Sequence, residues 1–413
     1  MLARKSINPQ QMIGSHMTIQ IVSQYYYPDN FIINDIAQEL AKRGHAVRVL
    51  TGLPDYATST VPLEYKLFRR RKEIVNGVNV RRVPIIVRRK GVLFRALNYV
   101  SFAVTASIYA LLSRKTYIDV IFANQTSPIF QVLPAIIYKW RTRKKLALYC
   151  YDLWPESMKA WGVGENNPAY RLVKKISRGL YRSCDVIAIT SKPFRQYLVE
   201  VCGIADEKIV YLPQYAEDTF VEIVGQYQEN GCVDFLFAGN IGAVQNLDCV
   251  LRAAALVNNK ESFRVHIVGD GSELKNLKQM TSELSLDSCV IFHGRHSQEA
   301  MEDFYKMADC FLLTLRGGDF IGMTLPGKAQ GYLCAGKPVL ATIDGAGREM
   351  MDEADCGEVV PANNHIELAE KMKLIIKNFD RYKQKGMNGR RFYEAHFTKD
   401  TYFDSLLAIL GEQ

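Results

Sequence analysis

Short glycine-rich stretches follow three consecutive apolar runs in the second half of the chain. Glycine allows the backbone to approach a ligand closely, and free N–H groups at the start of a following helix attract phosphate. Three such stretches in succession predict a nucleotide-binding site. The residues concerned are Gly239, Asn240, Gly242, Gly269, Asp270, Gly271, His293, Gly294 and Arg295.

A lysine follows a proline-glycine pair later in the same half, in the sequence TLPGK. Pro326 suits the first position of a helix and Gly336 its end. Lys328 then falls in the first helical turn, where a cation is unfavourable. We interpret Lys328 as a contact to phosphate; the alternative is a solvated surface lysine. The residues that precede it in this loop are Thr324, Leu325, Pro326 and Gly327.

Two carboxylates in the first half lie at the ends of apolar runs. Asp152 follows LALYCY, and Asp29 lies in the turn YYYPDN. Ligands of open α/β sheets bind beyond the carboxyl ends of the strands, so both residues are placed to contact an acceptor. The alternatives are a capped turn at Asp152 and a helix cap at Asp29. The sequence has no P-loop lysine motif and no intact GxGxxG, which argues against an ATPase and an ordinary dehydrogenase.

The elements that carry these residues alternate between strand and helix along the whole chain. This alternation predicts an α/β fold of two Rossmann-like domains, with parallel sheets that face an interdomain cleft. The length of 413 residues also favours two domains. The expected divisions are a cloning remnant (1–16), an acceptor-side domain (17–215), a linker (216–230), a nucleotide-sugar donor domain (231–395) and a C-terminal helix that packs back on the body (396–413).

The nine cysteines are irregularly spaced, and no CxxC occurs among them. An odd number without metal-ligand spacing argues against a disulfide framework or a zinc site and fits a reducing cytoplasm. We therefore expect no metal and no cofactor.

Positive charge is concentrated in one tract, residues 66–95, which holds eleven Lys and Arg against one acid. An anionic partner is implied, and we expect the inner face of the cell membrane, with Arg88, Arg89 and Lys90 facing it. A nucleic-acid partner is not expected, because no recognition motif accompanies the charge. The apolar segment 92–112 reaches the length of a membrane span, but we favour a buried helix of the first domain for most of it.

Several longer stretches together resemble family 4 of the retaining glycosyltransferases, in the branch that builds bacterial capsule and O-antigen units. The matching stretches are 25–56, YDLWPES (151–157), FAGNIGAVQNL (237–247), VGDGSEL (268–274), 292–313 and PGKAQGYLCAGKPVLATIDG (326–345). They occur in the family's order and span nearly the whole chain. The LPGK-type loop is similar to that of N-acetyl-fucosaminyl transferases.

The resemblance implies the two-domain GT-B fold, a nucleotide-diphosphate sugar donor with UDP as the expected nucleotide, and no metal. It places Gly294–Arg295 on the base, Asn240–Gly242 and Gly327–Lys328 around the diphosphate, and residues 316–325 near the sugar. Asp29 and Asp152 would line the acceptor side, with Lys328 the third catalytic candidate.

The sequence departs from the family pattern at the donor. Many members carry two Glu residues where this chain has Met323 and Gly331, and an Arg and a Lys where it offers Asn240, Gln245 and Asn246. The diphosphate charge would then be met by Lys328, Arg295, Arg316 and backbone dipoles. These residues complete the expected donor site.

The expected function is transfer of a hexosyl or N-acetyl-aminohexosyl unit to a lipid-linked saccharide, with retention of configuration, in bacterial surface polysaccharide synthesis. The enzyme would be cytoplasmic and peripheral to the membrane. Two alternatives stay open. One is a nucleotide-sugar epimerase of the same architecture, which would turn over donor without acceptor; the other is a non-catalytic subunit of a polysaccharide assembly complex.

Overall fold

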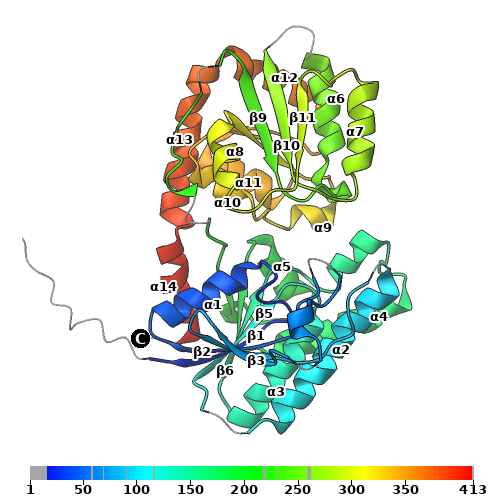
Figure 1. Ribbon diagram of the computed structural model, residues 1–413, viewed down its shortest axis with the longest axis vertical. Helices are drawn as coiled ribbons and strands as arrows, with labels where there is room; N and C mark the ends of the chain where they lie inside the picture. Colours follow the sequence, from blue (N-terminus) through cyan, green and yellow to red (C-terminus); the bar gives the residue numbers. More distant parts are fainter. Residues whose placement is uncertain are drawn as a thin grey trace, which may run out of the picture. The chain divides into compact units, whose positions relative to one another are not determined.

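The computed structural model describes residues 16–411, except 57–58, 68, 90, 115–116, 217–219, 229 and 258–261. The expected cloning remnant therefore lies outside the described residues, apart from His16. The chain forms two compact units (Figure 1). The first comprises the residues up to Thr190, Phe194–Leu212 and Asp404 onward, and the second comprises Ser191–Pro193 and Pro213–Phe403.

The first unit is built on an eight-stranded sheet in the order β3-β4-β2-β1-β5-β6-β7-β8. Neighbouring strands are parallel, except that β3 and β4 are antiparallel. Strand β5 is buried along its whole length, as expected for a parallel strand covered on both faces. The strands are β1 (Thr18–Val22), β2 (Ala46–Thr51), β3 (Lys72–Val75), β4 (Val78–Arg82), β5 (Val120–Gln125), β6 (Lys145–Cys150), β7 (Val186–Ile189) and β8 (Ile209–Tyr211).

The helices of the first unit bury apolar residues at helical spacing. Helix α1 buries Ile33, Ile36 and Leu40 on one face. It ends before Gly44, which has a φ of +96°, a conformation that glycine adopts at little energetic cost. Helices α2 and α3 pack against each other. The helices are α1 (Ile32–Lys42), α2 (Val92–Leu112), α3 (Leu133–Thr142), α4 (Pro168–Arg182) and α5 (Pro193–Glu200), with short 3-10 turns at Leu63–Tyr65, Ile129–Val132, Glu156–Trp161 and Asp206–Lys208.

The basic tract contains a β-hairpin that the sequence analysis did not predict. Strands β3 and β4 are joined by Asn76 and Gly77, and both have positive φ, 49° and 82°. An Asn-Gly pair in this conformation is a favoured two-residue hairpin turn. The density of charge in this tract concealed the strand pattern.

The second unit has a six-stranded parallel sheet in the order β11-β10-β9-β12-β13-β14. Alternate residues of β9 enter opposite cores: Phe235 and Phe237 pack on one face and Leu236 on the other. The predicted fold class, two Rossmann-like domains with parallel sheets, is confirmed. The strands are β9 (Val233–Ala238), β10 (Phe263–Val268), β11 (Val290–Gly294), β12 (Cys310–Thr314), β13 (Val339–Thr342) and β14 (Gly357–Val360).

Helices cover both faces of this second sheet. Residues 216–230, expected as a linker, contribute Phe220 and Ile223 to one of its cores, since both side chains are buried there. The helices are α6 (Leu247–Val257), α7 (Leu274–Glu283), α8 (Met301–Met307), α9 (Asp319–Gly322), α10 (Ala329–Cys334), α11 (Ala346–Ala354), α12 (His365–Lys377) and α13 (Phe379–His396), and a 3-10 turn spans Ala243–Gln245.

The chain ends in helix α14 (Lys399–Leu410), whose residues from Asp404 onward belong to the first unit. Leu406 and Leu410 are buried, and Lys145 donates to the carbonyl of Ile409 at 2.6 Å. The C-terminal segment thus returns to the sheet on which the chain began.

Candidate functional site: a strand-end site in each unit

The order of strands in the second unit reverses at β9. Strands β10 and β11 lie on one side of β9, and β12, β13 and β14 on the other. Crossovers leave such a reversal point in opposite directions, which opens a crevice beyond the carboxyl ends of the two central strands. The loops after β9 and β12 are therefore the parts of this unit best placed to hold a ligand.

Glycines in these loops allow backbone to meet backbone. A side chain at Gly269 would place its Cβ 1.8 Å from the carbonyl oxygen of Gly239, and one at Gly271 would lie 2.2 Å from that of Ile241. The N–H of Gly239 donates to Val268 at 2.9 Å. Gly269 and Gly271 therefore allow the loops to pack backbone against backbone. The sequence analysis predicted a different role for them, as sources of free amides that bind phosphate.

Two amides of the β9 loop remain available. Within the part of the chain that the structure describes, the N–H groups of Asn240 and Gly242 have no hydrogen-bond partner. Asp270 lies at the neighbouring strand end, where its carboxylate accepts from the N–H of Gly271 at 2.7 Å. The backbone N–H groups that are available to bind an anion thus lie in the short segment after Gly239.

Lys328 reaches this same segment from the other side of the reversal point. Its ammonium donates to Oε1 of Gln245 at 2.7 Å and lies 3.8 Å from the ring centroid of Phe237. A Cβ added to Gly239 would be 3.1 Å from Nζ. Burial lowers the pKa of Lys328 to about 7, because no carboxylate offsets the loss of solvation. Lys328 is not a solvated surface lysine.

The surroundings of Gly331 are tight for one of the two acids of the family pattern. A Cβ at Gly331 would lie 3.2 Å from the hydroxyl of Tyr305 and 3.3 Å from Phe220, so a carboxylate there would be buried against aromatic rings. Helix α10 starts at Ala329 and has only six residues, so Lys328 precedes it instead of lying in its first turn. The expected helix dipole therefore contributes little.

The rest of this loop is short and folded. The N–H of Thr324 donates to Ile321, Leu325 is half-buried, Pro326 is buried, and Gly327 is exposed beside the amide of Gln214. These residues form the support from which Lys328 projects.

The two arginines expected at the donor site differ in whether their side chains are accessible to a ligand. Arg316 is engaged, since its guanidinium bonds Asp248 at 2.8 Å and the carbonyl of Ala243 at 3.0 Å. Arg295 is exposed next to Gly294, which has a φ of +76°. Arg295 is thus accessible to a ligand, whereas Arg316 braces the β9 loop.

His293 belongs to a chain of hydrogen bonds across the sheet. Its Nε2 lies 2.9 Å from Nδ1 of His266, whose Nε2 lies 3.1 Å from Asp234. Burial, followed by the charges of His266 and His296, lowers the pKa of His293. His293 is therefore held as a neutral ring beside the β11 strand end.

In the first unit, Asp152 follows β6 and is held by its own turn. Its carboxylate accepts from Nε1 of Trp154 at 3.2 Å and from the hydroxyl of Ser157. Burial raises the pKa of Asp152 to about 6, although hydrogen bonds from Ser157, Ser127 and Trp154 oppose the rise. The capped-turn alternative is thus realised in the geometry, and the carboxyl group still titrates near neutral pH.

Asp29 lies at the β1 end of the same sheet. Its Oδ2 accepts from the N–H of Tyr56 at 3.1 Å, and Asn34 donates to its carbonyl at 2.8 Å. Next to it is a carboxylate that the sequence analysis missed, Asp55, which accepts from the N–H of Arg88 at 2.6 Å. Burial raises the pKa of Asp55 to about 6. Its position after β2, in TGLPDY, was the available signal.

The three residues expected to face a membrane are placed differently. The guanidinium of Arg88 turns toward Tyr25, at 3.4 Å from its hydroxyl, and lies 4.5 Å from the ring centroid of Tyr56. Arg89 is exposed and lies over Phe94. Lys90 lies outside the described residues. The side chain of Arg88 is thus held by Tyr25 and Tyr56, while its backbone N–H bonds Asp55.

Helix α2 is buried on one face only. Phe102 and Ala106 are fully buried, as expected for a helix of the first domain. The opposite face exposes an apolar stripe at helical spacing. Its residues are Leu93, Leu97, Val100, Val104, Ile108 and Leu111. Among the described helices none combines the length and the hydropathy that a membrane crossing needs.

The described residues contain no group of three or more His, Cys, Asp or Glu side chains arranged to hold a metal ion.

The fold is that of the GT-B glycosyltransferases, and two family models match the chain. The family model described as "Glycosyltransferase Family 4" matches residues 32–214, and "Glycosyl transferases group 1" matches residues 225–392. Together the two models cover most of both units. The resemblance read from the sequence is thus confirmed at the level of glycosyltransferase family.

Among curated proteins, the chain is similar to a probable glycosyltransferase, WbjE, of Pseudomonas aeruginosa, with 27% identity over 63% of this chain and 66% of that protein. It is also similar to WcaI of Escherichia coli, a putative colanic acid biosynthesis glycosyl transferase, with 24% identity over 75% of this chain and 78% of that protein.

Among solved structures, HepE of Anabaena in complex with UDP and glucose superposes with a TM-score of 0.68 at 15% identity, covering 96% of this chain and 99% of HepE. WaaG, a glycosyltransferase involved in lipopolysaccharide biosynthesis, gives a TM-score of 0.67 at 14% identity, covering 95% of this chain and 100% of WaaG. These likenesses show the shared fold.

Proposed function

We propose that this protein transfers a hexosyl or N-acetyl-aminohexosyl unit from a nucleotide-diphosphate sugar, UDP-linked, to a lipid-linked saccharide in bacterial surface polysaccharide synthesis. The observation that carries the proposal is the ammonium of Lys328 at the strand reversal, 2.7 Å from Gln245 and next to Gly239. After Gly239 come the N–H groups of Asn240 and Gly242, which have no hydrogen-bond partner among the described residues. A diphosphate is the ligand that best matches one buried cation and two free N–H donors.

Gln245 lies in the stretch in which many family members carry an Arg and a Lys, and in which this chain has Asn240, Gln245 and Asn246. The side-chain amide oxygen of Gln245 accepts a hydrogen bond from the ammonium of Lys328, which lies in a loop 83 residues further along the chain. This contact supports our proposal that Lys328 supplies the positive charge that those members provide from this stretch. A partly buried lysine with a pKa near neutrality would gain its full charge when an anion arrives, which would strengthen the contact at the moment of binding.

The proposed reaction breaks the bond between the anomeric carbon and the diphosphate oxygen and forms a bond from the acceptor hydroxyl oxygen to that carbon. Retention requires the acceptor to approach from the face that the diphosphate leaves. The departing phosphate then takes the hydroxyl proton, so no protein nucleophile is needed. Lys328 and the β9-loop amides stabilise the charge that develops on the leaving group.

The first unit would bind the acceptor. Its strand ends carry the carboxyl groups of Asp29, Asp55 and Asp152, which can accept hydrogen bonds from sugar hydroxyls. They would repel a diphosphate, which supports assigning the donor to the second unit. WcaI and WaaG act in surface polysaccharide or lipopolysaccharide synthesis by their names, and this favours the same class of acceptor here.

A lipid-linked acceptor requires access to a membrane surface. The exposed stripe of α2 offers an apolar face, and Arg89 lies over Phe94 at the start of the same helix, a pattern that suits a helix in a membrane interface. We therefore propose peripheral attachment to the inner face of the cell membrane through α2 and exposed arginines such as Arg89.

Isothermal titration with UDP, GDP, dTDP and ADP tests the donor assignment. We expect UDP to bind and the other nucleotides to bind more weakly. Incubation with the matching UDP-sugar, with and without a lipid-linked saccharide, then distinguishes transfer from epimerisation. Binding of none of the four nucleotides would overturn the proposal.

A further inference from the structure

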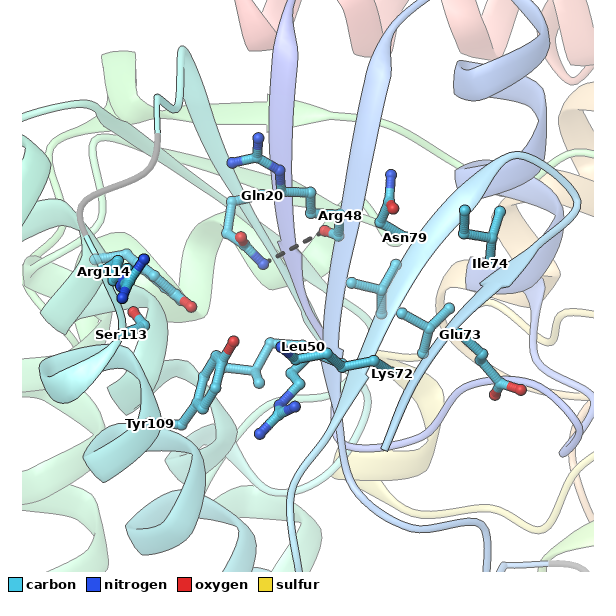
Figure 2. Close-up of a pocket in the computed structure, with 14 residues that line it drawn as sticks. Gln20, Arg48, Leu50, Lys72, Glu73, Ile74, Asn79, Tyr109, Ser113 and Arg114 are labelled. Atoms are coloured by element: carbon cyan, nitrogen blue, oxygen red, sulfur yellow. Dashed lines mark hydrogen bonds between the residues drawn. The ribbon is translucent and has the colours of Figure 1, made fainter. Parts of the chain in front are cut away.

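The first unit, which does not carry the proposed donor site, contains a cavity of about 640 Å³ on the face of its sheet (Figure 2). Its floor consists of side chains that the strand register aligns in rows. Gln20 of β1 pairs with Arg48 of β2, Arg48 with Asn79 of β4, and Asn79 with Ile74 of β3. In the next row Arg81 of β4 lies between its neighbours on β2 and β3.

The wall of the cavity is the last part of α2. Figure 2 shows Tyr109, Ser113 and Arg114 on one side and Arg48 and Lys72 on the other. The C-terminal end of this helix is fixed, because the guanidinium of Arg141 donates to the carbonyl of Ser113 at 2.7 Å. The cavity is therefore framed by a sheet and a fixed helix end.

The charge in this cavity is almost entirely positive. Four cations line it: Arg48, Lys72, Arg81 and Arg114. The single acid among the described lining residues is Glu73, and Nε of Arg82 already bonds it at 3.0 Å. A parallel sheet that packs on both faces is ordinarily apolar, so two arginines in successive rows of its face are a departure that calls for a ligand.

Arg81 is the clearest sign that this charge is not balanced within the protein. Its Nε is buried and has no hydrogen-bond partner among the described residues, while its guanidinium lies 4.9 Å from the ring centroid of Tyr109. Nearby, burial and the charges of Arg81 and Arg82 lower the pKa of Arg71. Mutual repulsion of this kind is relieved when an anion binds between the guanidinium groups.

We propose that this cavity binds a phosphate-bearing anion, as a second anionic site separate from the donor site. Planar guanidinium groups match phosphate oxygens in pairs, and several cations that face one cavity favour a group with more than one negative charge. Tyr109 and Tyr138 add aromatic surface for an organic portion of the ligand. The source is either a lipid headgroup or a free phosphate compound.

Titration with inorganic pyrophosphate tests the site in the full chain carrying Lys328→Ala, which weakens the proposed donor site. We expect one binding event that weakens at least tenfold in Arg48→Gln with Arg81→Gln. Arg48 and Arg81 belong to the sheet, so a variant that leaves folding unaffected is also needed. That variant is Lys72→Gln with Arg114→Gln, because both of these side chains are exposed. Arg381→Gln with Arg391→Gln removes two exposed charges from α13 and should change nothing.

Competition separates the two sources. Short-chain phosphatidylglycerol that displaces pyrophosphate identifies a lipid headgroup, whereas failure to displace it identifies a free phosphate compound. Absence of pyrophosphate binding, or binding that neither cavity variant weakens, overturns the proposal. The donor proposal fails independently, since its readout is UDP binding to the chain with Lys328 intact.

Discussion

The strand ends of the two units hold opposite kinds of chemistry. In the first unit they carry the carboxyl groups of Asp29, Asp55 and Asp152 inside hydrogen-bond networks, and in the second the loop after β9 carries backbone amides that meet the ammonium of Lys328. Burial acts on both in the same way: it raises the pKa of Asp152 to about 6 and lowers that of Lys328 to about 7. Each group is thus shifted toward its neutral form.

This contrast assigns the partners of the proposed reaction. An arriving diphosphate restores the charge of Lys328, whereas a neutral sugar hydroxyl can approach Asp152 without electrostatic cost. Variants that affect one unit and spare the other therefore test the division directly.

The largest expected effect is on stability in the second unit. Gly269→Ala forces a Cβ against the carbonyl of Gly239 in a backbone with φ of +139°. We expect a loss of about 3 kcal/mol or more in the free energy of unfolding, measured by urea denaturation. Gly231→Ala is the control: its φ is +71° with open space around it, so about 1 kcal/mol is expected. Equal losses would show that the loops do not pack as described.

The next effect is on catalysis in the first unit. Asp152→Asn keeps the shape of the side chain and removes the charge, so transfer should fall about 30-fold, the equivalent of about 2 kcal/mol. UDP affinity should be unchanged, because donor binding belongs to the second unit. A loss of UDP affinity in this variant, or a fall in activity only in proportion to its loss of stability, would contradict the assignment of Asp152 to acceptor binding.

The next effect is on membrane attachment through the exposed stripe of α2 in the first unit. Val104→Ser with Ile108→Ser alters two half-exposed residues of α2, 50% and 51% exposed, and should reduce binding to anionic vesicles about tenfold. Binding should also weaken in high salt, which screens the basic tract. Ile366→Ser in α12, 59% exposed, is the matched control and should have no effect. Salt-resistant binding that needs detergent for release would show that α2 inserts more deeply.

The smallest effect is a pH dependence of donor affinity. Lys328 must be protonated to hold a diphosphate, and its pKa is about 7 in the free protein. UDP affinity should therefore fall as pH rises, by about fivefold between pH 7 and pH 8, where UDP itself is already ionised. Calorimetry across this range measures it. A flat profile would mean that Lys328 stays charged or does not contact the ligand.

Local patterns in the sequence were sufficient to predict most of the fold. The alternation in β9 and the helical spacing in α1 each reflect a buried face, which is visible within a few residues. The β3–β4 hairpin escaped notice because its faces carry charge instead of an apolar stripe. Its Asn76-Gly77 turn was the remaining signal.

The sites were harder to predict because their partners are distant in sequence. Glycine identity located the β9 and β10 loops, but only the structure shows that Gly269 packs on Gly239. Arg88 was expected to face a membrane, yet Tyr25 and Tyr56 draw it into the domain. The pairing of Lys328 with Gln245 joins two loops that no local pattern connects.

The assignment of Lys328 to the diphosphate is tested most directly by moving its charge. Lys328→Met should lower UDP affinity at least tenfold, since it removes the buried cation. Adding Gln245→Lys should restore most of that affinity, because the two side chains meet at 2.7 Å and a lysine at 245 can place its ammonium in the same position. Unchanged UDP binding in Lys328→Met, measured by calorimetry at pH 7, would contradict the account.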